Sequence, residues 1–124
     1  MVLVDTSSWI ETLRHKGDLA VRERIRDLVV DGKAAWCDVI RLELWNGVRA
    51  GTEHKELQSL ETVVHHFAID DAVWRKAMDL SKRSRALGLT AGVPDLIIVA
   101  TAQRHGVEIE SRDQDIHRLL AINA

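Results

Sequence analysis

The sequence has very little of several residue types, and each shortage excludes a class of protein. The single cysteine, Cys37, has no second cysteine to pair with, which argues against a small disulfide-stabilised secreted domain. No apolar run approaches the roughly 20 residues that a membrane-spanning helix needs. The opening residues, MVLVDTSSW, contain no basic stretch and no small-residue cleavage site. We therefore expect a cytoplasmic protein with no membrane segment.

Neither basic nor acidic residues are in large excess. The chain has 17 basic and 19 acidic residues, a formal net charge of -2. Proteins that bind a long duplex are usually basic, so this balance argues against that class. It does not exclude an enzyme that holds a short stretch of RNA at a metal site, where cations neutralise the phosphates. With 124 residues, one proline and no repeat or linker, we expect a single domain over residues 1–124.

Apolar runs and helical spacings alternate along the chain. Val2–Val4 is a short β-branched apolar run that ends at Asp5, which is typical of a buried parallel strand. Further strands are expected over 34–37, 66–69 and 107–110. Helices are expected over 6–13, 19–30, 38 to about 51, 53–64, 71 to about 88 and 94–106, with a short terminal helix. This alternation predicts an α/β sandwich around a mostly parallel sheet.

Acidic residues occupy positions that could converge in such a fold. Asp5 ends the first strand, and Asp113 and Asp115 follow the last one. Glu43 lies one turn into the helix that we expect Asp38 to cap. Asp95 follows Pro94 in the first turn of a helix. Because sites in parallel sheets lie beyond the carboxyl ends of the strands, these acids could form one cluster.

Clustered carboxylates repel one another unless a cation lies among them. Oxygen ligands, with no Cys or His set at metal spacing, favour Mg²⁺ or Mn²⁺ over zinc. Such an ion can assist hydrolysis of a phosphodiester. Each acid also has a simpler explanation, since spacing alone does not prove convergence. Asp5, Asp113 or Asp115 could cap a helix, Asp95 could complement a helix dipole, and Glu43 could be a solvated helix residue.

The sequence resembles a known family along nearly its whole length. The opening VLVDTSSWI, the helix VIRLEL with Glu43, the segment VPDLIIVATAQRHGVEI with Asp95, and the segment SRDQDI with Asp113 occur in that order. They resemble PIN domains, in particular VapC-type toxins of toxin–antitoxin pairs. The family usually has Thr-x-Asp-x-Asp-Phe in the last segment, whereas this chain has Ser111 and Ile116 at the Thr and Phe positions.

The resemblance implies a PIN-like three-layer α/β/α sandwich and an endoribonuclease that uses Mg²⁺ or Mn²⁺. It also implies a homodimer and a VapB-type antitoxin whose tail occludes the acidic pocket. By family pattern the acids of the catalytic set are Asp5, Glu43, Asp95 and Asp113, and the metal ligands are Asp5, Asp95, Asp113 and Asp115. Thr6 or Ser7 matches the hydroxyl position that helps to hold water or substrate. Whether Asp113 or Asp115 is the main fourth acid stays open.

Other residues carry weaker signals. Arg112, beside the fourth acid, is a candidate for a phosphate or acid contact. The basic run 81–85 could contact phosphate or could complement the end of its helix. The four tryptophans are expected in core or interface packing, and Cys37 as a buried apolar residue. No histidine pair has a zinc-type spacing, and we expect no catalytic histidine.

Three other functions remain as alternatives. Asp5 could be the nucleophile of a phosphatase, but Ser7 stands where that class needs a second acid. The chain could be a silent partner that only dimerises and holds an antitoxin, although all the matched acids are present. It could cut DNA as larger flap nucleases of this fold do, although it lacks the length for their DNA-holding elements.

Overall fold

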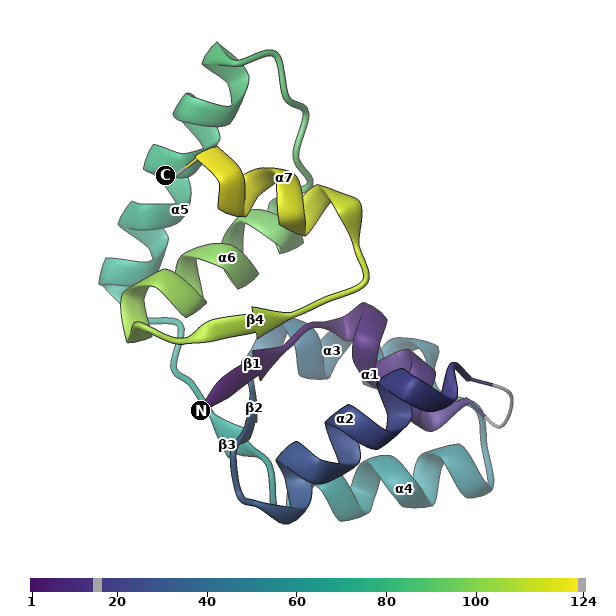
Figure 1. The fold of residues 1–124 in the computed structure, drawn as a ribbon. Coiled ribbons are helices and arrows are strands. Elements are labelled where there is room, and N and C mark those ends of the chain that lie inside the picture. Colours follow the sequence, from purple (N-terminus) through teal and green to yellow (C-terminus); the bar gives the residue numbers. More distant parts are fainter. Residues whose placement is uncertain (15–16, 123–124) are drawn as a thin grey trace.

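The computed structural model describes residues 1–14 and 17–122, and its helices and strands alternate as the sequence predicts (Figure 1). The strands are β1 (Val2–Val4), β2 (Ala34–Trp36), β3 (His65–His66) and β4 (Glu108–Glu110). The helices are α1 (Thr6–Leu13), α2 (Leu19–Val30), α3 (Asp38–Gly47), α4 (Thr52–Glu61), α5 (Asp71–Ala86), α6 (Val93–His105) and α7 (Gln114–Ile122). No helix in this part of the chain is long and apolar enough to cross a membrane.

All four strands run parallel, in the order β3-β2-β1-β4. Val2 lies opposite Ala34 on one side and Glu108 on the other, and Val4 lies opposite Glu110. The apolar run at the start of the chain therefore forms a central strand. Because β1 and β4 are parallel and in this register, the residues that follow each of them emerge at the same edge of the sheet.

Helices cover both faces of this sheet (Figure 1). Helices α1, α2 and α4 lie on one side, and α5, α6 and α7 lie on the other. Helix α3 contacts both α1 and α6. The arrangement is the three-layer α/β/α sandwich that the resemblance implies, with a fully parallel sheet.

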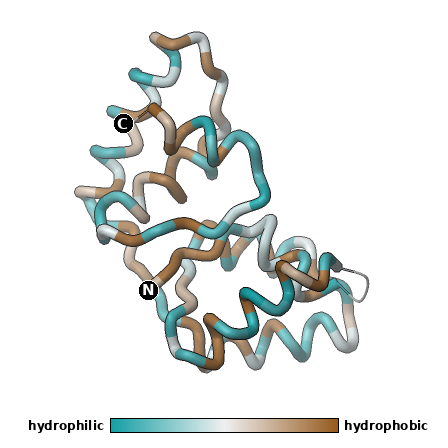
Figure 2. The backbone as a smooth tube through the Cα atoms, viewed as in Figure 1, coloured by the Kyte–Doolittle hydropathy of each residue, from teal (hydrophilic) through white to brown (hydrophobic). Residues whose placement is uncertain are grey.

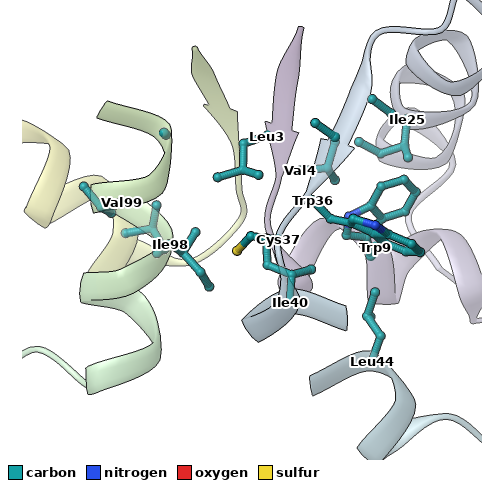
Figure 3. Packing of buried hydrophobic residues seen from close by; sticks show 14 of the residues in the cluster. Leu3, Val4, Trp9, Ile25, Trp36, Cys37, Ile40, Leu44, Ile98 and Val99 are labelled. Atoms are coloured by element: carbon teal, nitrogen blue, oxygen red, sulfur yellow. The ribbon is translucent and has the colours of Figure 1, made fainter. Parts of the chain in front are cut away.

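The core forms on both faces because successive strand residues point to opposite sides. Leu3 points toward Ile98 and Val99 of α6, whereas Val4 points toward Ile25 of α2 (Figure 3). Apolar residues follow β1 and α6 in Figure 2. The run 96–102 of α6 is buried at every position. Because the other elements pack against this helix on every side, its first turn is held in place, and Asp95 lies in that turn.

Some sequence-based expectations were wrong in detail. The third strand covers His65–His66 rather than 66–69, because the carbonyl oxygen of Ala68 bonds the His105 ring and Asp70 then caps α5. Helix α3 ends at Gly47 rather than near 51, and helix α4 covers Thr52–Glu61 rather than 53–64.

One side-chain expectation also needs correction, and others are met. Asp38 does not cap α3, since it is the first helical residue and its carboxylate bonds Arg41 instead. Trp9 and Trp36 are buried with ring centroids 5.6 Å apart, as expected of core residues. Trp74, by contrast, is 42% exposed on α5, so of the two expected settings, core or interface, the core is excluded for it. Cys37 is buried, and burial raises the pKa of its thiol, so it is the inert apolar residue that was expected.

Candidate metal centre

The first acid of the site is held in place by hydroxyl groups. Asp5 follows β1, is 3% exposed, and occupies the N-cap position of α1, yet its carboxylate caps no backbone N–H. Its Oδ2 instead accepts hydrogen bonds from Ser7 Oγ (2.9 Å) and Ser111 Oγ (2.8 Å). In the described part of the chain no donor bonds its Oδ1. The capping alternative therefore does not explain this side chain, and one carboxylate oxygen is left for a ligand.

The loop between β4 and α7 brings the next acid to Asp5. Ser111, which donates to Asp5, accepts a hydrogen bond from the backbone N–H of Asp113 at 2.9 Å. The backbone N–H of Arg112 donates to Ser7 Oγ at 3.0 Å. Residues more than a hundred positions apart thus form one hydrogen-bonded unit at the edge of the sheet. Sequence reasoning proposed Ser7 for an auxiliary role but gave Ser111 none beyond its place in the family pattern.

Three carboxylates converge beside this unit. One oxygen from each of Asp95, Asp113 and Asp115 lies within 4.8 Å of the others. Asp95 is in the first turn of α6, Asp113 precedes α7, and Asp115 is in the first turn of α7. Asp113 also accepts a hydrogen bond from the backbone N–H of Asp115. It therefore caps α7, as the simpler explanation held, and it is also a member of the acid group. Both candidates for the fourth acid belong to this group.

Asp95 shows how unfavourable the crowding is. Partial burial raises the pKa of its carboxyl group to about 6, with further contributions from the negative charges of Asp113, Asp5, Asp115 and Glu43. No described side chain or backbone N–H donates a hydrogen bond to it. The helix dipole at the start of α6 favours the charged form, and it is outweighed. The four other predicted acids are therefore all close enough to act on Asp95.

Glu43 lies outside the group of three but belongs to the same region. Its Oε1 accepts a hydrogen bond from Thr6 Oγ1 at 2.8 Å, which joins α3 to the start of α1. Glu43 is exposed, so it is the solvated helix residue of the simpler explanation and also has this hydrogen-bond partner. The negative charge of Glu43 also raises the pKa of Asp95, but it is the smallest of the causes named for that shift.

The donor set fits a divalent cation. In the part of the chain that the structure describes, Asp95, Asp113 and Asp115 are the one group of three or more acids, histidines or cysteines close enough to share an ion. All the donors are carboxylate oxygens, which suit Mg²⁺ or Mn²⁺ better than zinc. A cation there would relieve the repulsion that raises the pKa of Asp95.

Two arginines border the acids. Arg118 Nη1 lies 3.0 Å from Asp115 Oδ1, a contact that sequence reasoning missed although the two residues are three apart on an expected helix. Arg112 Nη1 lies 2.9 Å from Asp18 Oδ2. Its predicted acid contact thus goes to the start of α2 and not to the cluster. This guanidinium also lowers the pKa of Asp18.

Hollows adjoin the cluster on two sides. One of ≈ 500 Å³ is lined by Glu43, Arg14 and Arg49 above the apolar side chains of Ile10 and Leu44. A smaller one of ≈ 220 Å³ is lined by Asp115 and Arg118. Each hollow shares one acid with the site and includes at least one cation. Positive and negative side chains therefore lie together in both hollows.

The fold and this acid cluster are those of a nuclease-like α/β domain, and comparison with known proteins identifies the family. A family model for the PIN domain matches residues 2–120, so the chain belongs to the PIN-domain family. Within that family it is a VapC-type protein. Ribonuclease VapC11 of Mycobacterium tuberculosis is 34% identical over 119 residues, which cover 93% of this chain and 88% of that one. Ribonuclease VapC21 of the same organism is 31% identical over 106 residues, 83% of this chain and 77% of that one.

Solved structures show the same fold at lower identity. FitAcB from Neisseria gonorrhoeae has a TM-score of 0.74 at 19% identity and covers all of this chain and 94% of its own. VapBC2 from Rickettsia felis, bound to a DNA fragment from its promoter, has a TM-score of 0.79 at 15% identity. It covers 95% of this chain and 92% of its own. At these identities the likeness shows the architecture alone.

Proposed function

We propose that the chain is a single PIN domain over residues 1–124 that cuts RNA internally with the help of Mg²⁺ or Mn²⁺. The observation that carries the proposal is the group of three carboxylates beside buried Asp5, with the pKa of Asp95 raised to about 6. An arrangement this unfavourable without a cation is a feature of sites that use one. The ribonuclease names of relatives above 30% identity support RNA as the substrate.

The acids would divide the work by position. Asp95, Asp113 and Asp115 would hold the cation, and Asp5 would contribute its Oδ1. A bound divalent cation polarises a phosphodiester and makes water a better nucleophile. Ser7 would fix the orientation of Asp5, and Thr6 would fix that of Glu43 as the remaining member of the catalytic set.

The two hollows support a polymeric substrate. Arg14 and Arg49, which line the larger hollow, would contact phosphates that flank the cut, whereas Arg118 in the smaller hollow is already paired with Asp115. Arg112 is held by Asp18, and its proposed auxiliary role is therefore indirect. The basic run 81–85 stays a weaker prediction, because Ser84 within it is buried.

We further propose that the protein is a cytoplasmic toxin that dimerises and is neutralised by a VapB-type antitoxin. Structures with this fold include a toxin–antitoxin complex from Klebsiella pneumoniae and VapBC complexes. For dimerisation, α5 offers Trp74 and Met78, four residues apart and 42% and 62% exposed. A dimer interface would cover these two apolar side chains, which lie on one face of the helix.

The decisive experiment is a cleavage assay on tRNA, rRNA and mRNA with Mg²⁺, Mn²⁺ or excess EDTA, with single-stranded DNA as a second substrate. Asp95→Asn and Asp5→Asn should each lower RNA cleavage by about 100-fold or more. This equals or exceeds the largest loss usual for residues that contact a metal ligand rather than the metal itself. Asp27→Asn is the matched control, since Asp27 is an exposed aspartate of α2 outside the cluster. Undiminished cleavage in EDTA would contradict the metal mechanism, and cleavage of DNA alone would contradict the substrate.

A further inference from the structure

Helix α2 is joined to the end of β4 and to the loop that follows it by two ion pairs of opposite polarity. Asp18, at the start of the helix, bonds Arg112 of the loop at 2.9 Å. Arg24, further along the helix, bonds Glu110 at the end of β4, with 2.8 Å between Nε and Oε1. These four residues are called the α2 clasp below. Because the polarity reverses between the two pairs, sliding the helix along the loop would place like charges together.

Asp18 is itself fixed from several directions. Its Oδ1 caps α2 by accepting hydrogen bonds from the backbone N–H groups of Ala20 and Val21, at 2.9 and 3.3 Å. Its own backbone N–H donates to Glu11 Oε2 at 2.7 Å. The other carboxylate oxygen, Oδ2, is the one that bonds Arg112. A carboxylate that the helix already holds loses little further freedom when it binds the guanidinium.

Arg112 is the residue through which the clasp reaches the acids. It stands between Ser111, which bonds Asp5, and Asp113, which belongs to the group of three. Its backbone N–H is bonded to Ser7 and its side chain to Asp18. A change in the position of Arg112 must therefore move at least one of the two site residues next to it.

We propose that Asp18, acting through Arg112 and supported by the pair Arg24–Glu110, positions the 111–113 loop so that Asp113 faces Asp95 and Asp115. Asp18 is thus a positioning residue of the metal centre, although it lies far from Asp113 in the sequence and is not a member of the acid cluster. The inference rests on the proposed function, since it takes Asp113 as a cation ligand.

The exposure of the clasp defines what kind of effect to expect. The side chains of Arg112 and Asp18 are 41% and 42% exposed, so water screens their attraction. The pair should contribute little to overall stability. Its effect should instead be seen in the geometry of the loop, and so in how tightly the acids bind a cation.

The test compares three full-length variants: Asp18→Asn, Arg112→Gln and the two together. Asparagine caps helices about as well as aspartate, so the first variant removes the charge and keeps the cap. Arg26→Gln is the matched control, because Arg26 is exposed on the same helix and makes no ion pair with any described residue. Mn²⁺ affinity is measured without RNA, by titration calorimetry and by electron paramagnetic resonance. Exchange of the backbone amide protons of Asp113 and Asp115 is measured by NMR in metal-free protein.

We expect the Mn²⁺ dissociation constant to rise about 10-fold in each single variant and no further in the double variant. Amide exchange at Asp113 and Asp115 should become faster, and Arg112→Lys should recover most of the affinity. Arg26→Gln should match the wild type. A loss of thermal stability without these changes would indicate a merely structural pair and would overturn the proposal.

Other outcomes separate the inference from the proposed function. Unchanged Mn²⁺ affinity with a raised KM for RNA in Arg112→Gln alone would make Arg112 a substrate contact and would overturn the clasp. A wild type that binds Mn²⁺ but cuts no RNA would refute the proposed activity, while the Mn²⁺ affinities still decide the role of Asp18. If the wild type bound no Mn²⁺, unchanged amide exchange in Asp18→Asn would overturn the positioning role, and faster exchange would support it.

Discussion

The two sides of the acid cluster are built differently. On the side formed by β1, α1 and α3, each acid accepts hydrogen bonds from hydroxyl groups: Asp5 from Ser7 and Ser111, and Glu43 from Thr6. On the side formed by α6 and α7, Asp95 accepts none from the described residues and instead faces other carboxylates. The first side is held in position in advance. The second contains a repulsion that only a proton or a cation relieves.

This difference assigns separate physical roles to residues that look alike in the sequence. Hydroxyl donors stabilise a carboxylate in its charged form and fix its direction. Crowded acids lower the stability of the folded protein and raise its affinity for a cation. Stability and function are therefore expected to change together on the first side and in opposite directions on the second.

The strongest test of the first side is the substitution Ser111→Ala. It removes a donor to a carboxylate that is 3% exposed, and it also removes the acceptor for the backbone N–H of Asp113. The free energy of unfolding should fall by about 2 kcal/mol, as is usual for hydrogen bonds to buried charged groups. Urea denaturation in EDTA measures it.

Two controls sharpen that result. Ser59→Ala removes a hydroxyl that bonds only a backbone carbonyl within α4 and should change stability by less than about 0.5 kcal/mol. Ser111→Thr keeps the hydroxyl and restores the residue usual in VapC-type sequences, so it should retain most of the stability. If Ser111→Ala proved as harmless as Ser59→Ala, the hydroxyl contacts would not be what holds Asp5.

The second side predicts an effect of the opposite sign. With its pKa raised from 3.8 to about 6, the Asp95 carboxyl group binds more protons in the folded than in the unfolded state between these values. Its contribution to stability is therefore greatest below about pH 4 and is lost as the pH rises through 6. After allowance for partial exposure, the cost at pH 7 is about 1–2 kcal/mol.

Asp95→Asn isolates this cost. In EDTA the variant should be more stable than the wild type at pH 7, and the difference should shrink as the pH falls toward 4. Urea denaturation of both proteins between pH 4.5 and 7.5 measures it. Saturating Mg²⁺ should stabilise the wild type and should have less effect on the variant. Equal stabilities at every pH would show that the crowding of Asp95 carries no energetic cost.

The sequence predicted the individual acids of the site unequally well. Asp5 and Asp95 follow from local signals, since an apolar strand ends at the first and a proline opens the helix that carries the second. Glu43 depended on family resemblance, because a lone acid on a helix surface has no local signature. The meeting of Asp18 with Arg112 could not be predicted, since it depends on where α2 packs against β4. The early end of β3 likewise depends on the contact of Ala68 with His105.

The smallest effect is expected at Thr6, and it tests whether the first side acts as a whole. Thr6→Val removes the hydroxyl that bonds Glu43 and keeps the shape of the side chain. Because this bond is exposed to solvent, the free energy of unfolding should change by less than about 0.5 kcal/mol. RNA cleavage should fall by no more than about 10-fold, since Glu43 keeps its place on α3 and loses only its orientation.

A double variant shows how Thr6 works. If the hydroxyl matters only because it orients Glu43, then Thr6→Val added to Glu43→Gln should lower kcat no further than Glu43→Gln alone. Single-turnover cleavage rates of the two single variants and the double variant measure this. A further loss in the double variant would mean that Thr6 contacts water or substrate directly. In that case the first side would contain a group that takes part in the reaction. Hydroxyl groups that only hold an acid in position would then be found at Asp5 alone.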